Sequence, residues 1–246
     1  MAITISVSKT PEELGEKAAE TIARLINNAI DENGEARIIL STGMSQFETL
    51  SALIKKNVDW SKVTMFHLDE YVGLPETHIA SFRKYLKERF ISKVNLKEYY
   101  LVNGEGDVQR NISILSEKLK EKTVDVGVIG IGENGHIAFN DPPADFDDDR
   151  AYKVVNLDHK CRMQQVGEGW FATEDDVPRQ AITMLPKQIM SCRHIVTAAP
   201  HAVKAEAICN TITKPISPMI PGTLLKSHPD WYLFIDDDSA KNLLAL

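Results

Sequence analysis

Two acidic residues stand together at the end of a short apolar run of the sequence. Residues 63–68 have the composition of a buried strand, and Asp69 and Glu70 follow them directly. In open parallel sheets ligands bind at the carboxyl ends of the strands, so acids at this point are candidates for chemistry. One of the two carboxylates is a candidate general base, and its neighbour either orients it or faces solvent. The structural alternative is that Asp69 caps a turn or a helix.

A glycine-rich loop follows another apolar run, at residues 124–129. The segment Gly130-Ile131-Gly132-Glu133-Asn134-Gly135 formally matches the GxGxxG pattern of dinucleotide-binding proteins. That pattern must open a long helix, whereas Pro142 and Pro143 stop any helix here after about two turns. We therefore interpret the glycines as a tight loop whose backbone approaches a ligand closely.

His136 and Asp141 continue this loop and are candidates for a proton-transfer pair. Histidine exchanges protons near neutral pH, and an acid behind it fixes its tautomer. Simple helical spacing does not pair the two residues, so they meet only if the segment between them curves. The alternative is a structural or merely exposed loop histidine.

Two further segments are candidates for binding a phosphate. Ser41-Thr42-Gly43-Met44-Ser45 follows the apolar run 38–40 and opens a helix, so its amides and hydroxyls stand at the positive end of the helix dipole. Lys204 comes early in a later predicted helix, where its ammonium can reach an anion at the strand ends. The ordinary alternatives are a plain helix cap and a solvated surface lysine.

The elements that must position these residues alternate along the chain. Apolar runs at 38–40, 63–68, 124–129, 194–198 and 231–235 indicate buried strands, and amphipathic segments separate them at about 45–57, 79–92, 108–121, 200–212 and 238–245. This order predicts an α/β fold with a parallel sheet and helices on each side. No linker divides the chain, so we predict one domain over residues 1–246. The irregular segment at about 141–180 predicts a lid or a small subdomain on the main sheet.

The first helix has a defined start and end. Thr10 is predicted as its N-cap, with Pro11 in the first helical position and Glu13 closing a capping box. Gly34 stands just past its end.

The composition argues against several classes of function. The net charge is −7 and the pI about 5.5, which disfavours a protein that binds nucleic acid or an anionic membrane through a basic face. No run approaches the roughly 18 apolar residues of a membrane helix, and the first residues lack the features of a secretory signal. We expect a cytoplasmic protein.

The cysteines indicate neither disulfides nor a metal centre. Cys161, Cys192 and Cys209 form no CxxC pair and suit the reduced thiols of a cytosolic protein. Cys161 lies between Lys160 and Arg162, and we expect it to be a surface thiol. No group of residues has the spacing of a known metal motif, so we predict no metal.

Taken together, these segments resemble the glucosamine-6-phosphate deaminase/isomerase family along nearly the whole chain. The matching motifs, in order, are Ser41-Thr42-Gly43-Met44-Ser45, Leu68-Asp69-Glu70-Tyr71-Val72-Gly73-Leu74-Pro75, Gly130-Ile131-Gly132-Glu133-Asn134-Gly135-His136-Ile137-Ala138-Phe139-Asn140, Lys204-Ala205 and Ser227-His228-Pro229-Asp230. The second and third are long and specific. The resemblance implies a Rossmann-like, mostly parallel sheet of the kind shared with sugar-phosphate isomerases and lactonases.

The resemblance also implies an activity, the deamination and isomerisation of glucosamine 6-phosphate to fructose 6-phosphate and ammonia. Asp69 would move a proton between carbons 2 and 1 of the open-chain sugar, and His136 would assist ring opening. Asp141 would orient His136, and the backbone of residues 42–45 would hold the phosphate together with Lys204. The resemblance implies no metal and no organic cofactor, and water would displace ammonia at carbon 2.

Some positions depart from the family pattern. Asn134 stands where many members have Asp, and because an amide cannot relay a proton, His136 is expected to depend on Asp141. Asp141 itself stands where Glu is usual and is one methylene shorter. Ser41 and Met44 replace more usual residues of the phosphate loop, and Arg162 is the candidate for the phosphate-binding Arg of the lid.

Alternative activities are another amino-sugar phosphate such as galactosamine 6-phosphate, hydrolysis of 6-phosphogluconolactone, and non-catalytic sensing of a sugar phosphate. The lactonase is disfavoured because Asp69-Glu70-Tyr71 and Phe139-Asn140 belong to the deaminase pattern, and the sensor because no helix-turn-helix segment is attached. We expect a phosphorylated amino sugar as the ligand, with no nucleic acid and no membrane. The oligomeric state is left open between a monomer and a homo-oligomer.

Overall fold

Seven parallel strands form the central sheet of the computed structural model, which describes residues 2–245. Their order in space is β1-β10-β9-β6-β2-β3-β5. The bounds are β1 (Ala2–Ser8), β2 (Ala36–Leu40), β3 (Val63–His67), β5 (Glu98–Tyr100), β6 (Val126–Val128), β9 (His194–Ala199) and β10 (Asp230–Asp236). The parallel sheet is confirmed, and the five predicted runs coincide with β2, β3, β6, β9 and β10.

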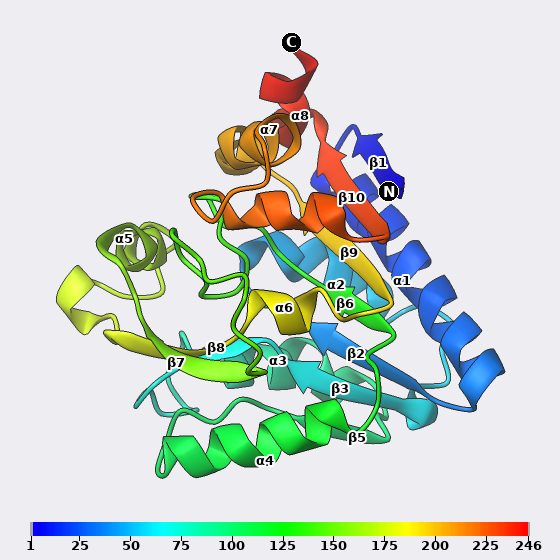
Figure 1. The fold of residues 1–246 in the computed structure, drawn as a ribbon. Coiled ribbons are helices and arrows are strands. Elements are labelled where there is room, and N and C mark those ends of the chain that lie inside the picture. The colour runs from blue at the N-terminus through cyan, green and yellow to red at the C-terminus, as the bar shows by residue number, and fades with distance from the viewer. Residues whose placement is uncertain (1, 246) are drawn as a thin grey trace.

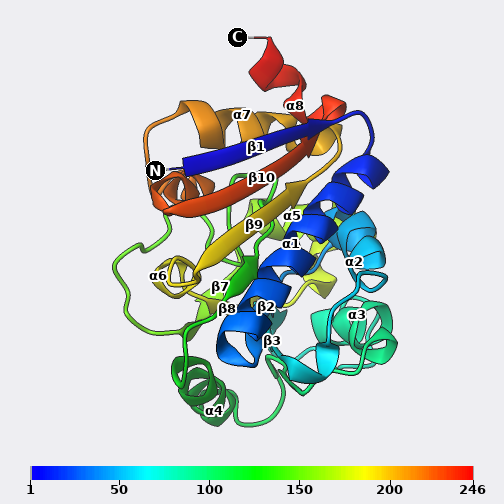
Figure 2. The same ribbon diagram turned by 90° about the vertical axis from the view of Figure 1, so that its right-hand side faces the viewer.

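Helices cover both faces of this sheet, as predicted (Figures 1 and 2). Their bounds are α1 (Pro11–Asn33), α2 (Phe47–Leu53), α3 (Phe82–Arg89), α4 (Val108–Lys120), α5 (His159–Gly167), α6 (Pro186–Ile189), α7 (Ala205–Thr213) and α8 (Asp237–Leu244). The short 3-10 helices are η1 (Met44–Gln46), η2 (Trp60–Lys62), η3 (Ile91–Lys93), η4 (Glu174–Asp176), η5 (Ala202–Lys204) and η6 (Pro221–Ser227).

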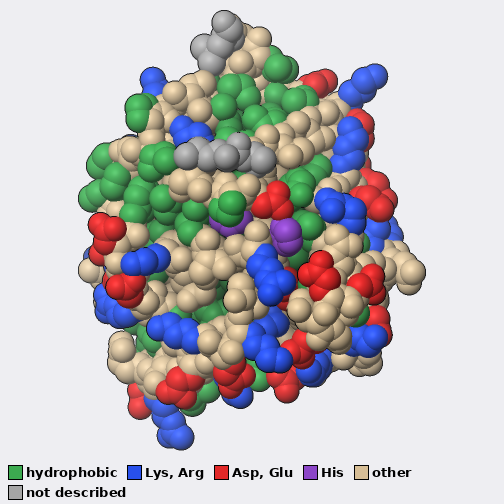
Figure 3. Space-filling model, turned by 45° about the vertical axis from the view of Figure 1, so that its right-hand side comes forward, with side chains coloured by type: hydrophobic (Ala, Val, Ile, Leu, Met, Phe, Trp, Pro, Cys, Tyr) green, Lys and Arg blue, Asp and Glu red, His purple; other side chains and the backbone are tan. Residues whose placement is uncertain are grey.

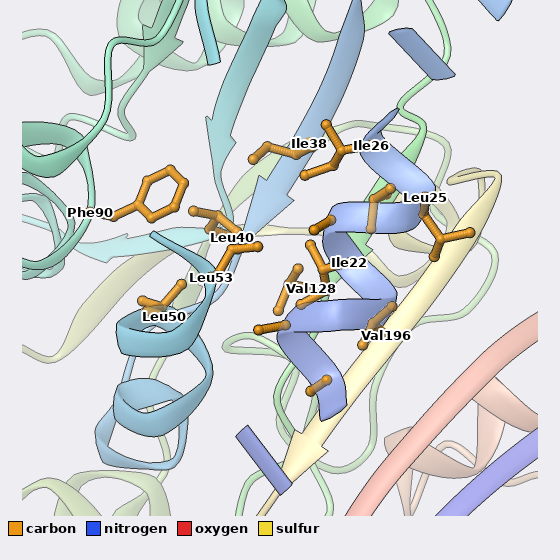
Figure 4. Close-up of a cluster of buried hydrophobic side chains, with 14 of the residues drawn as sticks. Ile22, Leu25, Ile26, Ile38, Leu40, Leu50, Leu53, Phe90, Val128 and Val196 are labelled. Atoms are coloured by element: carbon orange, nitrogen blue, oxygen red, sulfur yellow. The ribbon is translucent and has the colours of Figure 1, made fainter. Parts of the chain in front are cut away.

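Two hydrophobic clusters, one on each face, join the helices to the sheet. On one face α1, α2 and α3 pack on the strands, and Figure 4 shows Ile22 and Ile26 of α1 facing Ile38 of β2 and Val128 of β6. On the other face Ile39 of β2 belongs to a second cluster with residues of α4, α6, α7 and α8. Because successive side chains of a strand point to opposite faces, β2 is apolar on both and lies at the centre of the fold.

The N-terminus of α1 differs in one detail from the predicted capping box. The Thr10 side chain accepts a hydrogen bond from the Glu13 amide at 3.3 Å, and Gly34 adopts the left-handed conformation at the C-terminal end. The Glu13 carboxylate, however, accepts from the amide of Lys9 at 2.9 Å instead of that of Thr10. The cap therefore extends one residue further back along the chain than the sequence indicated.

A second, antiparallel sheet of three strands stands beside the first and was not predicted. It has the order β4-β8-β7, with β4 (Asp69–Tyr71), β7 (Tyr152–Asn156) and β8 (Gln180–Met184). Only Leu68 separates β4 from the end of β3. The segment at about 141–180 thus carries β7, α5 and η4, and Figure 1 shows α5 with β7 and β8 to one side of the main sheet.

The surface mixes charges of both signs. Figure 3 shows basic and acidic side chains interspersed over the lower part of one face and hydrophobic side chains gathered in its upper part. Ile5, Val7 and Leu244, of β1 and α8, are among the exposed hydrophobic residues. Among residues 2–245, no helix is both long and apolar enough to cross a membrane.

Candidate active site

One large cavity opens at the carboxyl ends of β2, β3, β6 and β9, with a volume of about 1460 Å³. Nine of the residues singled out from the sequence line it: Ser41, Thr42, Gly43, Met44, Ser45, Asp69, Asn134, His136 and Lys204. Glu70, Asp141 and Arg162 do not line it. The topology places these loops together because parallel strands end at the same edge of a sheet.

Asp69 begins β4 and presents a nearly buried carboxyl group to the cavity, with 6% of the residue exposed. Burial, and next the negative charge of Glu70, raise the pKa of Asp69 to about 8. A carboxyl group with a pKa near neutrality can both take up and release a proton at physiological pH. Asp69 therefore has the position and the acidity of a proton-transfer group.

Glu70 points away from the cavity and holds the start of α3. Its buried carboxylate accepts hydrogen bonds from the Ser81 hydroxyl at 2.9 Å and from the Arg83 amide at 2.9 Å, and Arg83 pairs with it through Nε at 3.2 Å. Neither expectation for this residue, orientation of Asp69 by direct contact or exposure to solvent, describes these contacts. Glu70 instead joins β4 to the beginning of α3. The helix cap that was considered for Asp69 is therefore made by Glu70.

His136 and Asp141 are brought together by a curved loop. Nδ1 of His136 lies 2.9 Å from Oδ1 of Asp141, and Ala138 between them has a positive φ of 50°, which turns the chain back. Asn134 donates to the same Oδ1 at 3.2 Å and accepts from the His136 amide at 3.0 Å. Burial by itself raises the pKa of Asp141, but the hydrogen bond and charge of His136 outweigh it and hold the pKa below its usual value.

Glycine is required under the histidine ring. A Cβ at Gly132 would lie 2.2 Å from Nε2 of His136, closer than any side chain tolerates. The same loop is fixed from outside, because Asn140 donates to the Met184 carbonyl of β8 at 2.8 Å and the Gly222 amide donates to the Gly135 carbonyl at 2.7 Å. The glycines thus allow close approach within the loop, here to the His136 ring, and residues 130–141 contain no helix. The approach of this backbone to a ligand stays a prediction.

The phosphate-binding candidates line the same cavity as His136. The segment 41–45 leads from β2 into η1, with Gly43 at φ 100° and its carbonyl accepting from the Tyr85 hydroxyl at 2.9 Å. Lys204 is only 7% exposed, and its ammonium forms no ion pair within the part of the chain that the structure describes. Burial lowers the pKa of Lys204, and the charges of Glu168 and Glu133 partly offset this. A buried ammonium that lacks a partner is a site for an anion.

Arg162 is engaged elsewhere. Its Nη1 donates to the Leu157 carbonyl at 2.6 Å and its Nε to the Glu174 carboxylate at 3.1 Å. Lys160, two positions earlier on α5, lines the cavity instead. Residues two apart on a helix point to opposite sides, so Lys160 and Arg162 cannot both face the cavity. Of these two basic residues the structure therefore places Lys160, and not Arg162, in the cavity lining.

Cys161 is fully buried, so the surface thiol expected from its basic neighbours is wrong. Cys161 lies on the buried side of α5, between its two more exposed neighbours Lys160 and Arg162. Burial raises the pKa of its thiol well above the ordinary value. Its Sγ, a ring nitrogen of His136 and a carboxylate oxygen of Asp141 all lie within 4.8 Å of one another. The sequence carried no signal for this, since no spacing motif joins the three residues.

Comparison with known proteins places these features in one family. The model of the family described as "Glucosamine-6-phosphate isomerases/6-phosphogluconolactonase" matches residues 9–232. The chain is 36% identical over 229 residues to a glucosamine-6-phosphate deaminase of Listeria monocytogenes serotype 4a, covering 92% of this chain and 94% of the relative. It is 34% identical over 208 residues to one of Streptococcus pneumoniae strain 70585, covering 84% and 87%.

Solved structures have the same fold. A structure described as a monomeric glucosamine-6-phosphate deaminase superposes with a TM-score of 0.88 at 28% identity, covering 97% of this chain and 99% of that one. The 6-phosphogluconolactonase of Trypanosoma brucei superposes with a TM-score of 0.81 at 17% identity, covering 98% and 99%, and shows the fold alone. With its α/β sheet and the cavity at the strand ends, the chain belongs to the family of glucosamine-6-phosphate isomerases and 6-phosphogluconolactonases.

Proposed function

We propose that this protein deaminates and isomerises glucosamine 6-phosphate to fructose 6-phosphate and ammonia. The observation that carries the proposal is that one cavity is lined at once by the carboxyl group of Asp69, the imidazole of His136 and the ammonium of Lys204. The reaction needs these three functions: a proton carrier beside carbons 1 and 2, a proton shuttle for the ring oxygen and an anchor for the phosphate. The names of the relatives from Listeria and Streptococcus support the same substrate.

Binding begins with the phosphate. Lys204 and the backbone amides of 42–45 hold it, because they offer a buried positive charge and backbone donors in the lining of one cavity. Lys160 of α5 adds a second charge from above. Held at this end, the sugar extends along the cavity toward the strand ends that carry Asp69 and His136.

Ring opening precedes isomerisation. Nδ1 of His136 donates to Asp141, so Nε2 faces the cavity as the nitrogen that exchanges a proton with the ring oxygen. Asp141 orients the His136 ring. The side-chain amide of Asn134 in turn donates a hydrogen bond to the Asp141 carboxylate and does not relay a proton itself. The product of this step is the open-chain aldehyde with an amino group at carbon 2.

Asp69 then moves the proton from carbon 2 to carbon 1. Removal of the carbon 2 proton gives an enolamine, and return of the proton to carbon 1 gives an imine at carbon 2. Water adds to that carbon and ammonia leaves, which yields the ketose phosphate. Protein side chains and water perform every step of this sequence.

The segment at about 141–180 is proposed as the lid of a single domain. It carries α5, whose Lys160, Met163 and Gln164 line the cavity opposite the segment 41–45. We place the activity in the cytoplasm, which is supported by the reduced state expected for Cys161, Cys192 and Cys209. The proposal leaves the oligomeric state open between a monomer and a homo-oligomer.

The test is a direct assay of both products. The purified protein is incubated with glucosamine 6-phosphate, and ammonia and fructose 6-phosphate are measured, with Asp69→Asn as the inactive control. Parallel incubations with galactosamine 6-phosphate and 6-phosphogluconolactone separate the epimer and the lactonase. Absence of ammonia from the wild-type protein, or equal release from galactosamine 6-phosphate, would overturn the proposed substrate.

A further inference from the structure

Three side chains of different chemistry converge beside the cavity. A ring nitrogen of His136, a carboxylate oxygen of Asp141 and Sγ of Cys161 all lie within 4.8 Å of one another. His136 and Asp141 come from the loop 130–141, whereas Cys161 comes from the first turn of α5. The histidine side chain is 12% exposed and lines the cavity, Asp141 is 9% exposed, and Cys161 is fully buried.

The cluster has unused capacity to bind a ligand. Oδ1 of Asp141 accepts from His136 and Asn134, but its buried Oδ2 has no partner at hydrogen-bond geometry among residues 2–245, and the Cys161 thiol beside it helps to lower the pKa of Asp141. An unpartnered carboxylate oxygen in a buried place carries a desolvation cost that a cation would remove. The thiol beside it favours a metal cation that binds sulfur ligands.

Imidazole, carboxylate and thiolate together form a ligand set that zinc prefers. Zn²⁺ takes nitrogen, oxygen and sulfur ligands in a tetrahedron, and its bond lengths place the ligand atoms about 3.5 Å apart. The cluster needs to contract by about 1 Å to reach that spacing from its upper bound of 4.8 Å. Of the three residues only His136 lines the cavity, so the cluster lies behind the imidazole ring, on the side of Asp141 and Cys161.

We propose that His136, Asp141 and Cys161 form an inhibitory Zn²⁺ site within the active site. Binding breaks the S–H bond of Cys161, whose proton passes to solvent, and forms Zn–S, Zn–N and Zn–O bonds. With zinc on Nδ1, the ring keeps its hydrogen on Nε2 and can no longer take up a proton there. The histidine then cannot exchange protons with the substrate. The inhibition rests on the proposed function, whereas the binding does not.

The binding is tested with cobalt, which replaces zinc and gives a near-ultraviolet thiolate-to-metal absorption when a cysteine is a ligand. Metal-free wild-type protein is titrated with Co²⁺ and then with Zn²⁺, which should remove the band. Cys161→Ser and Cys161→Ala should lose the band, and Cys209→Ser, a half-buried cysteine on α7, should keep it. Two substitutions are used so that a folding defect in one does not decide the outcome.

The inhibition is measured separately, on glucosamine 6-phosphate turnover with a chelator to reverse it. Loss of one metal ligand should raise the Zn²⁺ concentration for half-inhibition by about 10-fold or more in both Cys161 variants, with turnover in the chelator unchanged. A cobalt band without inhibition by Zn²⁺ would refute the inhibitory role. The site itself would be refuted if the wild-type protein gave no cobalt band, or if both Cys161→Ser and Cys161→Ala kept the band. If the enzyme does not act on glucosamine 6-phosphate at all, the cobalt titration still decides the site.

Discussion

Nδ1 of His136 lies 2.9 Å from Oδ1 of Asp141, and both groups are held in a loop that also carries Gly132 and Asn134. The distance is that of a hydrogen bond between an imidazole and a carboxylate, with the ring nitrogen on the cavity side left free. Asp141 is one methylene shorter than glutamate, and the curve of the loop at Ala138 brings its carboxylate within hydrogen-bond distance of the ring.

Replacing Asp141 tests this pair. Asp141→Asn keeps the shape but removes the charge that fixes the tautomer of His136, so we expect kcat to fall by about 100-fold or more with little change in KM. Asp141→Glu should keep more activity than Asp141→Asn because it retains the carboxylate. Steady-state kinetics on glucosamine 6-phosphate measure both, and an unchanged kcat in Asp141→Asn would show that His136 works without this acid.

Asp69 is expected to affect both turnover and stability. Asp69→Asn should lower kcat by about 100-fold or more, since an amide cannot take up the carbon proton. Because burial and Glu70 raise the pKa of Asp69 to about 8, the folded protein holds a proton that the unfolded chain releases above about pH 4.

That difference sets the sign of a pH effect. The free energy of unfolding contributed by Asp69 is fully present below about pH 4 and is lost as pH rises to about 8. Asp69→Asn removes this loss, so the variant should gain stability over the wild type as pH rises, with the largest gain near pH 8. Urea unfolding at about pH 5 and pH 8 measures it, with Asp31→Asn, an exposed acid on α1, as the control. Equal differences at both pH values would mean that Asp69 is already ionised when buried.

Lys204 should act on binding. Lys204→Met keeps the volume of the side chain and removes a buried charge that meets the phosphate, so KM should rise by about 10-fold or more while kcat changes less. The exposed Lys55→Met is the matched control, because Lys55 is far from the cavity lining. Inhibition by inorganic phosphate, weaker in Lys204→Met than in the wild type, gives a second measure. A KM that does not move would assign the phosphate to other groups.

Lys160 and Arg162 give a comparison within one helix. Lys160 lines the cavity and Arg162 pairs with Glu174, so Lys160→Ala should raise KM by about 10-fold and Arg162→Ala should change it little. Arg162→Ala should instead lower the free energy of unfolding by about 1 kcal/mol or less, since the pair is partly exposed. The reverse pattern would place the arginine at the phosphate in the bound enzyme.

Gly132→Ala tests the fit of the loop. An added Cβ would stand 2.2 Å from Nε2 of His136, so the ring must move and kcat should fall by about 100-fold while the protein still folds. Gly167→Ala is the control: Gly167 also lines the cavity, but the added Cβ meets nothing within 4 Å, so kcat should fall far less than in Gly132→Ala. Circular dichroism confirms the fold of both variants.

The central sheet could be predicted because its inner strands are apolar on both faces. Runs such as 38–40 and 63–68 have no other stable place than a parallel sheet covered on each side. β1 was missed because Thr4 and Ser6 alternate with its apolar residues at the edge of the sheet, and β5 because only three mostly exposed residues form it. The small antiparallel sheet depends on pairing between distant segments, which no local pattern records.

The candidate site was predictable where its residues are close in sequence. His136 and Asp141 belong to one loop, and Asp69 follows a strand, so spacing and strand ends located them. Arg162 was misplaced because its direction on α5 depends on how that helix packs. Cys161 was misjudged for the same reason, since basic neighbours say nothing of which side of a helix is buried. Contacts between residues far apart in the sequence could not be predicted from it.

Asp69 also marks the junction between the two sheets. Only Leu68 separates the end of β3 from the start of β4. Through its pairing with β8, β4 belongs to the same antiparallel sheet as β7, which leads along the chain into α5. The strand that carries Asp69 and the sheet that leads into α5 are therefore joined by backbone hydrogen bonds. If α5 closes over the sugar as the proposed lid, a rotation of the small sheet would move the carboxyl group of Asp69 together with α5.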